Sequence, residues 1–254
     1  MKKWINLLFI GLLAIVVTAC SSNDEGDKAK ENAETNTSEK DTQDQAKQME
    51  EMQKKLDKQK IDENKTVAIV NGKKLLGSDY NNLLASTQTQ VQQMGQDPTT
   101  EEVAKQMKEQ TLDSLVGQTL LLQDADKKGY KASNEEVSKQ LDESKKQYKN
   151  EKEFNEALKN AGLDTNTLKL RIAESIKFNT YVDKEAKVAE TTDKEIQAYY
   201  DQVSKQGSST GQKLPELKDL KPKIKEQLEQ QKIQEKLVTK VEELKKQGKV
   251  EIKI

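Results

Sequence analysis

The sequence predicts a mostly α-helical protein with one small β-sheet, in which a hairpin near residue 70 meets the last residues of the chain. Charged residues make up 34% of the chain, hydrophobic residues 33% and aromatic residues only 4%, which suits long helices with charged faces better than a thick globular core. Apolar residues recur at spacings of three and four in most segments between residues 78 and 247. Short β-rich runs occur at 67–76 and at the C-terminus.

The first nineteen residues have the form of an export signal. Lys2 and Lys3 precede an apolar run from Leu7 to Val17, which is too short to span a bilayer because a spanning helix needs about 20 apolar residues. The run ends in Val17-Thr18-Ala19-Cys20, and small residues before a cysteine resemble the lipobox of bacterial lipoproteins. The resemblance implies cleavage after residue 19 and a diacylglyceryl thioether on Cys20, often with acylation of the new amino terminus. The alternative is an ordinary signal peptide with a leftover cysteine.

The inventory of reactive side chains excludes several kinds of enzyme. Cys20 is the only cysteine and there is no histidine, so disulfides, thiolate nucleophiles, cysteine or histidine metal sites and Ser-His-Asp triads are excluded. The neighbouring carboxylates Glu135-Glu136 and Glu242-Glu243 point about 100° apart on a helix, so they do not form acid/base pairs. We therefore expect no catalytic residues, no metal and no cofactor.

The charge balance excludes a nucleic-acid partner. Without residues 1–19 the chain keeps 41 basic and 44 acidic residues, a net charge of −3, and both signs are interspersed without a basic stripe. Residues 20–62 are polar and low in complexity, and we predict a disordered membrane tether there. Within it, Ala46–Lys60 carries Met49, Met52 and Leu56 at helical spacing and could form a fragile helix.

The predicted folded domain covers residues 63–254 and opens with a hairpin. Val67–Val70 and Lys73–Leu76 flank Asn71-Gly72, and an Asn-Gly pair between two such runs is the strongest short hairpin signal. Residues 249–254 alternate apolar and charged side chains, which predicts a strand. Because a lone strand is not stable, we expect this strand to pair with the hairpin.

Helix boundaries follow from capping residues and glycines. Ser78 is the expected cap of the first helix, and Thr99/Glu102, Ser133/Glu136 and Thr192/Glu195 have the spacing of capping boxes. Further helices are expected around Phe154–Leu158, from Thr165 to Val182, and over 214–247, with Gly95, Gly129, Gly162 and Gly248 as stops and a flexible loop at 204–213. The apolar seam at 217–244 is expected to pack mostly in cis on the helix at 103–126, or partly across a dimer.

The ordered set of elements resembles the N-terminal chaperone domain of the SurA and PrsA families. The resemblance rests on the following residues: Val70-Asn71-Gly72, Ser133–Val137, Glu153-Phe154, Leu158, Gly162-Leu163, Leu168 and the helix at 223–232 with the last strand. It covers about residues 64–254, and the lipobox agrees with PrsA, a lipoprotein of Gram-positive bacteria.

The sequence departs from these families in one respect. A parvulin prolyl-isomerase domain usually lies before the closing helix, but here only residues 189–213 separate Val188 from Leu214, and a domain needs at least about 50 residues. Parvulin sites also use histidines, which this chain lacks. The sequence therefore predicts the chaperone module without the isomerase.

The resemblance implies a foldase anchored on the outer face of the cell membrane that holds unfolded or nascent exported proteins in an apolar groove between helices, without ATP. Adaptable apolar and aromatic side chains suit such a surface. The candidates are Met94, Met107, Tyr148, Phe154, Phe178, Tyr181, Tyr199 and Tyr200, each with core packing as the alternative. Tyr199-Tyr200 is the preferred pair, because adjacent helical positions cannot both face one core stripe.

Two other functions stay open on the sequence. One is a peptidyl-prolyl isomerase with an unrecognised site, and the other is a non-chaperone envelope, spore or secretion-assembly lipoprotein built on the same helices. We expect a monomer or a weak dimer.

Overall fold

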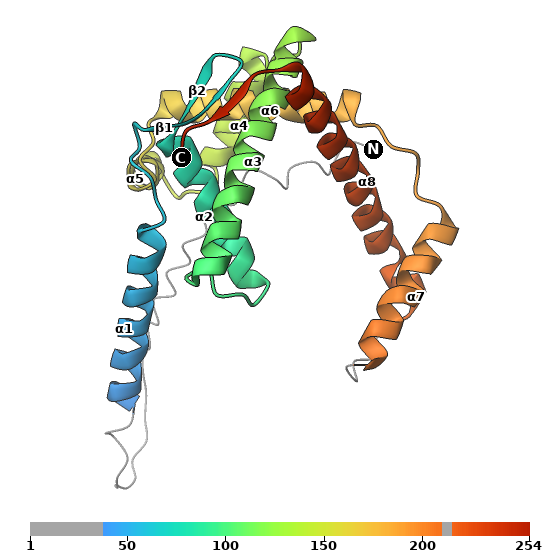
Figure 1. Ribbon diagram of the computed structural model, residues 1–254, viewed down its shortest axis with the longest axis horizontal. Coiled ribbons are helices and arrows are strands. Elements are labelled where there is room, and N and C mark those ends of the chain that lie inside the picture. The colour runs from blue at the N-terminus through green and yellow to red at the C-terminus, as the bar shows by residue number, and fades with distance from the viewer. Residues whose placement is uncertain (1–37, 210–214) are drawn as a thin grey trace, which may run out of the picture. The chain divides into compact units, whose positions relative to one another are not determined.

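The computed structural model describes residues 38–209 and 215–254 (Figure 1). The predicted signal peptide, Cys20 and the first part of the predicted tether lie outside the described residues. The chain divides into two compact units. Of the described residues, unit 1 holds 38–116 together with Val250–Ile254, and unit 2 holds 117–209 and 215–249.

The sheet of unit 1 confirms the predicted hairpin and the predicted partner of the last strand. Strands β1 (Thr66–Val70), β2 (Lys73–Leu76) and β3 (Val250–Ile252) form one antiparallel sheet in the order β2-β1-β3 (Figure 1). Asn71 and Gly72 both have positive φ, 51° and 86°, as a tight two-residue hairpin turn requires. The central strand is the most buried, with Val67, Ala68 and Val70 fully covered.

Helix α2 (Gly77–Gln93) packs against strands β1 and β2 in unit 1, which also holds the first part of α3 (Glu101–Lys127). Their buried residues include Tyr80, Leu84, Met107 and Val116. The predicted caps of both helices are wrong: α2 begins one residue before Ser78, with Asp79 accepting a hydrogen bond from Leu76 N, and Thr99 bonds to Asp97 rather than to Glu102. In both places an aspartate near the start of the helix accepts the backbone N–H: Asp79 accepts from Leu76, and Asp97 accepts from Thr99.

Helix α1 (Ser38–Asp57) lies in the segment that was predicted to be largely disordered, and it is longer than the predicted fragile helix. An ion pair of 2.7 Å between Lys54 and Glu50 supports its exposed face. Leu56 at its end is buried, and Gln88 Nε2 donates to the Leu56 carbonyl at 3.4 Å. Asn81 then brackets Ile61, accepting from its N–H at 2.9 Å and donating to its carbonyl at 2.7 Å. These long-range contacts attach α1 to unit 1 before residue 63.

Gly77 is expected to tolerate no side chain. A Cβ at this position would lie 2.0 Å from the carbonyl oxygen of Asp62, and the Gly77 N–H donates to Lys65 O at 2.8 Å, which prevents the backbone from moving away. We expect Gly77→Ala to lower the free energy of unfolding by about 3 kcal/mol, measured by urea denaturation. Ser78→Ala is the control, and it should change stability by no more than about 0.5 kcal/mol. Equal stability of both variants would contradict the packing.

Unit 2 consists of helices. The second part of α3 is followed by α4 (Asn134–Lys145), α5 (Glu151–Asn160), α6 (Thr165–Glu185), α7 (Asp193–Ser209) and α8 (Leu217–Gln247). The capping box of Ser133 and Glu136 is confirmed, and so is that of Thr192 and Glu195. Gly129 and Gly162 have positive φ at the helix ends where stops were predicted. The predicted flexible loop is partly helical, because α7 continues to Ser209.

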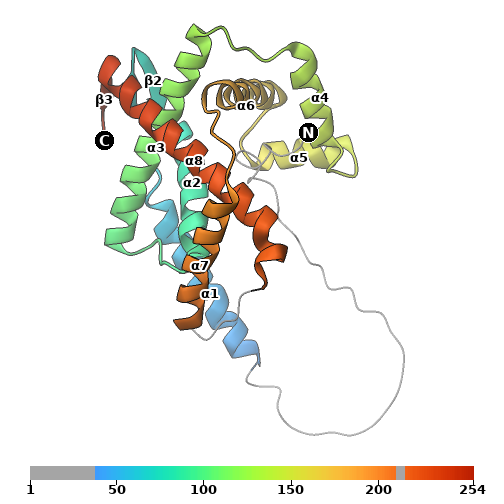
Figure 2. The ribbon, with the colours of Figure 1, turned by 90° about the vertical axis from the view of Figure 1, so that its right-hand side faces the viewer.

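Two helix pairs organise unit 2. Helix α4 packs on α6 around a buried cluster of Leu141, Phe154, Leu158 and Ile172. Helix α7 packs along α8, and the two lie side by side in both views (Figures 1 and 2). Val241 of α8 packs against Gly117 of α3, where a Cβ would approach it to 3.3 Å, so the seam of α8 makes part of its contact in cis.

Candidate functional site

The structure separates the predicted client-binding residues by burial. Met107, Phe154 and Tyr181 are buried at 1%, 3% and 0% exposure, and they serve core packing here. Tyr148, Phe178, Tyr199 and Tyr200 are half-buried. Met94, at the end of α2, is 61% exposed. The accessible candidates are therefore Met94 and the half-buried rings.

The buried candidates have specific partners in the core. In the α4–α6 cluster, Phe154 meets the ring of Tyr148 edge-on, with centroids 5.4 Å apart and an interplanar angle of 72°. Such pairs are worth roughly 0.5–1.5 kcal/mol beyond the area they bury. Lys145 also lies over the Phe154 ring, 5.8 Å from its centroid. Phe154 therefore joins the start of α5 to the end of α4.

Tyr181 is the centre of a polar and aromatic network that joins α6 to the end of α3. Its hydroxyl donates to Asp124 Oδ2 at 2.7 Å, and its ring meets Tyr130 edge-on at 6.2 Å. Tyr130 in turn donates to Glu185 at 2.7 Å, and Lys128 pairs with the same carboxylate. Burial, followed by the bond to Asp124, raises the pKa of the Tyr181 phenol well above its usual range, so the hydroxyl remains a donor. The spacing of apolar residues in the sequence could not predict this network, because its contacts join polar groups that are distant along the chain.

The two adjacent tyrosines of α7 have separate partners, one on α8 and one in the segment just before α8. Gln227 Nε2 donates to the Tyr199 hydroxyl at 2.6 Å, and the Tyr200 hydroxyl donates to the carbonyl of Pro215 at 2.9 Å. Ile196 and Ile224 are buried in the same helix pair. Both rings stay half-buried, so they combine an anchored hydroxyl with accessible apolar surface.

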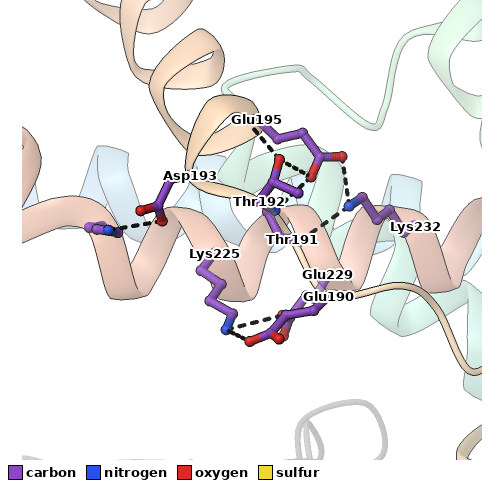
Figure 3. Close-up of polar contacts among 9 residues, drawn as sticks. Glu190, Thr191, Thr192, Asp193, Glu195, Lys225, Glu229 and Lys232 are labelled. Atoms are coloured by element: carbon purple, nitrogen blue, oxygen red, sulfur yellow. Dashed lines mark hydrogen bonds and ion pairs between the residues drawn. The ribbon is translucent and has the colours of Figure 1, made fainter.

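A row of four lysines on α8 holds the chain that leads into α7. We call Lys221, Lys225, Lys232 and Lys236 the lysine stripe, and residues 187–195 the strap. At 3.6 residues per turn the four lysines lie within about 60° of one another around the helix. Lys221 pairs with Asp193 at 2.9 Å, Lys225 with Glu190, and Lys232 with Glu195 at 2.7 Å (Figure 3).

Two further contacts complete the attachment of the strap. Lys232 also donates to the Thr191 hydroxyl at 3.4 Å, and Lys236 donates to the carbonyl of Lys187 at 2.8 Å. The strap therefore lies along α8 in the opposite direction to the helix. The sequence predicted long helices with charged faces and interspersed charges, and it did not single out these lysines. Their spacing of four, seven and four residues places them on one face of a helix, and this spacing could have identified the lysine stripe from the sequence.

Glu195 of the strap is expected to have a strongly acidic carboxyl group. The hydrogen bond from Lys232, followed by those from Thr192 N–H and Oγ, lowers its pKa from 4.5 to about 2. Because the folded value is the lower one, its stabilising contribution is present above pH 4.5 and is lost as the pH falls through about 2. Carboxyl ¹³C NMR titration should show this, and Lys232→Gln should raise the pKa. A titration near 4.5 in the unchanged chain would contradict the pairing.

A second class of accessible apolar side chains lies singly on helix surfaces. In unit 1, Met49 and Met52 of α1 are exposed, and Gln92 Nε2 approaches the Met52 sulfur to 3.7 Å. In unit 2, Leu170 of α6 is 68% exposed and Val238 of α8 is 50% exposed. These residues can meet an apolar partner without any rearrangement of the fold.

The described residues contain neither a cluster of metal-ligating side chains nor a helix suited to span a membrane. Within 38–209 and 215–254, no group of three or more His, Cys, Asp or Glu side chains is placed to hold a metal ion. No helix in these two ranges is both long and apolar enough to cross a membrane.

Comparisons with known proteins found one matching family and several relatives in sequence. The sequence profile of the family described as the SurA-like N-terminal domain matches residues 57–182. A foldase protein PrsA from Clostridium botulinum (strain Hall) is 25% identical over 213 residues, which cover 79% of this chain and 54% of the relative.

Two other relatives carry the same name. A foldase protein PrsA from Clostridium perfringens (strain SM101) is 30% identical over 149 residues, or 56% of this chain and 44% of the relative. That of Caldanaerobacter subterraneus is 28% identical over 144 residues, or 54% and 42%. The chain spans about half the length of the curated relatives it matches.

Proposed function

We propose that this chain, whose residues 57–182 match the SurA-like N-terminal domain and which is similar in sequence to PrsA foldases, is an ATP-independent chaperone for unfolded exported proteins. The observation that carries the proposal is the match of residues 57–182 to that domain. Its relatives are named foldases, and a foldase acts on polypeptide chains that still expose apolar residues.

The surface of unit 2 supports weak and broad binding. Leu170, Val238 and the half-buried rings of Tyr199 and Tyr200 offer apolar area among lysines and carboxylates. Each 100 Å² of apolar surface that a client buries contributes roughly 2.5 kcal/mol before the ordering costs are subtracted. A few such contacts give affinities that allow release by dilution or by folding of the client, without a nucleotide.

The proposed location of the protein in the cell rests on the N-terminal sequence. We propose that Cys20 is lipidated and that the chain is held on the outer face of the cytoplasmic membrane, where exported proteins emerge unfolded. This fits an ATP-independent mechanism because that compartment lacks ATP. The proposal rests on the residues before Cys20 and on the relation to PrsA.

Suppression of aggregation tests the function. The purified chain should reduce light scattering by a reduced, unfolded client at a few-fold molar excess. Leu170→Ser with Val238→Ser should weaken the suppression by about half or more, because accessible apolar area is removed. The matched control is Glu174→Ser with Glu242→Ser, two exposed positions on the same helices. No suppression at a tenfold excess would favour a non-chaperone interaction lipoprotein.

We expect no prolyl-isomerase activity from this chain. The stretch between Val188 and Leu214 is too short for a parvulin domain, much of it is helix α7, and the sequence has no histidine. Turnover of a proline-containing model peptide measures this directly. Catalysis by the purified chain above the uncatalysed rate would show that it contains an unrecognised active site.

A further inference from the structure

The lysine stripe is a cationic face, and a segment of the same chain occupies it. Three carboxylates of the strap, Glu190, Asp193 and Glu195, each meet a different lysine of the stripe. The lysine side chains in these pairs are 27–47% exposed, so solvent and salt screen the ion pairs. Exposed pairs of this kind are individually weak, which makes the strap displaceable.

The strap combines acidic and apolar side chains in a short stretch. Its acidic residues lead directly into Ile196, a buried residue of α7, and α7 packs on α8. Between Lys187 and Asp193 the chain is not helical, so it presents an extended backbone as well as side chains. Lys236 Nζ donates a hydrogen bond to the backbone carbonyl of Lys187, and a backbone carbonyl of any other polypeptide could accept the same bond. The strap therefore has the chemistry of an extended acidic and apolar peptide bound in cis.

We propose that the lysine stripe of α8 is a docking surface for extended client segments that carry acidic residues beside apolar ones, and that the strap is its internal competitor. The client in this statement rests on the proposed chaperone function. Charge complementarity identifies the occupant: four cations lie within about 60° of one helix face, and three of them pair with strap carboxylates, while Glu229 of α8 lies 3.9 Å from Lys225. An anionic partner matches such a face. A client must first displace the strap. The apparent affinity of the client is therefore its intrinsic affinity multiplied by the fraction of molecules in which the strap has left the lysine stripe.

Two matched double variants separate docking from simple opening. Glu190→Gln with Asp193→Asn breaks the first two ion pairs from the strap side, leaving the lysines and the capping box of Thr192 and Glu195 in place. Lys221→Gln with Lys225→Gln breaks the same two pairs from the helix side, together with the 3.9 Å pair between Lys225 and Glu229 within α8. Both variants remove the same two strap contacts, but only the first keeps the cations.

The experiment measures binding of a fluorescein-labelled 15-residue peptide of alternating acidic and apolar residues by anisotropy, at 50 mM and 500 mM NaCl. The carboxylate-side variant should bind about three- to tenfold more tightly than the unchanged chain, and the lysine-side variant at least threefold more weakly. A peptide with amides in place of the carboxylates should bind weakly to all three, and salt should weaken the acidic peptide most.

The outcomes decide the proposal. Hydrogen exchange of residues 193–205 should rise several-fold in both variants, relative to α3, which verifies that each opens the strap. If both variants then bind the acidic peptide with equal affinity, or if acidic and amide peptides bind alike, the docking proposal is wrong. If the peptide binds as expected but the chain holds no unfolded protein, the docking surface stands and the proposed chaperone function fails.

Discussion

We expect Tyr181→Ala to lower the free energy of unfolding by about 3–5 kcal/mol, which is a large part of the roughly 5–15 kcal/mol that stabilises a domain. The side chain is fully buried, so its removal leaves a ring-sized cavity. The substitution also removes the edge-on contact with Tyr130 and leaves Asp124 without the donor that lies 2.7 Å away. These losses all weaken the attachment of α6 to the end of α3.

Urea denaturation followed by circular dichroism measures this loss. Tyr181→Phe keeps the ring and removes only the hydroxyl, so it should cost about 1–3 kcal/mol. Tyr200→Phe is the matched control, because Tyr200 is half-buried and its hydroxyl meets only the carbonyl of Pro215 among the described contacts. If Tyr181→Ala kept full stability but lost client binding, Tyr181 would be a client contact rather than a core residue.

The second large effect concerns the membrane. We expect Cys20→Ser to abolish membrane association almost completely, because the acyl chains attached through this residue are the proposed anchor, and stable anchoring takes more than one chain. Cell fractionation and immunoblotting measure the distribution of the protein. The variant should appear in the medium, or stay as uncleaved precursor, with an unchanged circular dichroism spectrum of the purified folded part.

Ser22→Ala is the control for the lipid anchor, since it changes a neighbouring residue without removing the thiol. It should fractionate with the membrane like the unchanged chain. Metabolic labelling with a radioactive fatty acid gives a direct readout, and the label should be lost only in Cys20→Ser. Survival of membrane association in the serine variant would contradict the lipobox interpretation and favour the ordinary signal peptide.

Local signals in the sequence predicted most of the fold. The Asn71-Gly72 turn, the capping boxes at Ser133 and Thr192, and the glycine stops at 129 and 162 all depend on neighbours a few residues away. The pairing of the last strand with the hairpin also followed, because a strand needs a partner and one was present. The attachment of α1 was missed, since Asn81 and Gln88 act on backbone groups 20 and 32 residues away.

The candidate site was harder to predict for the same reason. Helical spacing places Met107, Phe154 and Tyr181 on apolar faces, but periodicity does not say whether another element covers such a face. Tyr199 and Tyr200 were singled out by their adjacency, and the structure gives their hydroxyls separate partners in Gln227 and Pro215. The contact between the strap and the lysine stripe was not predicted, because a row of lysines on a helix usually faces solvent and the sequence does not show which carboxylates lie opposite it.

Composition and local spacing are enough to predict the helical class, the small sheet, the exclusion of histidine and disulfide chemistry and the export address. The folded arrangement was needed to show which aromatic side chains are covered, where α1 attaches and which lysines of α8 hold the strap. The physical reason is that burial and ion pairing depend on groups distant along the chain, whose approach is fixed by packing rather than by local sequence.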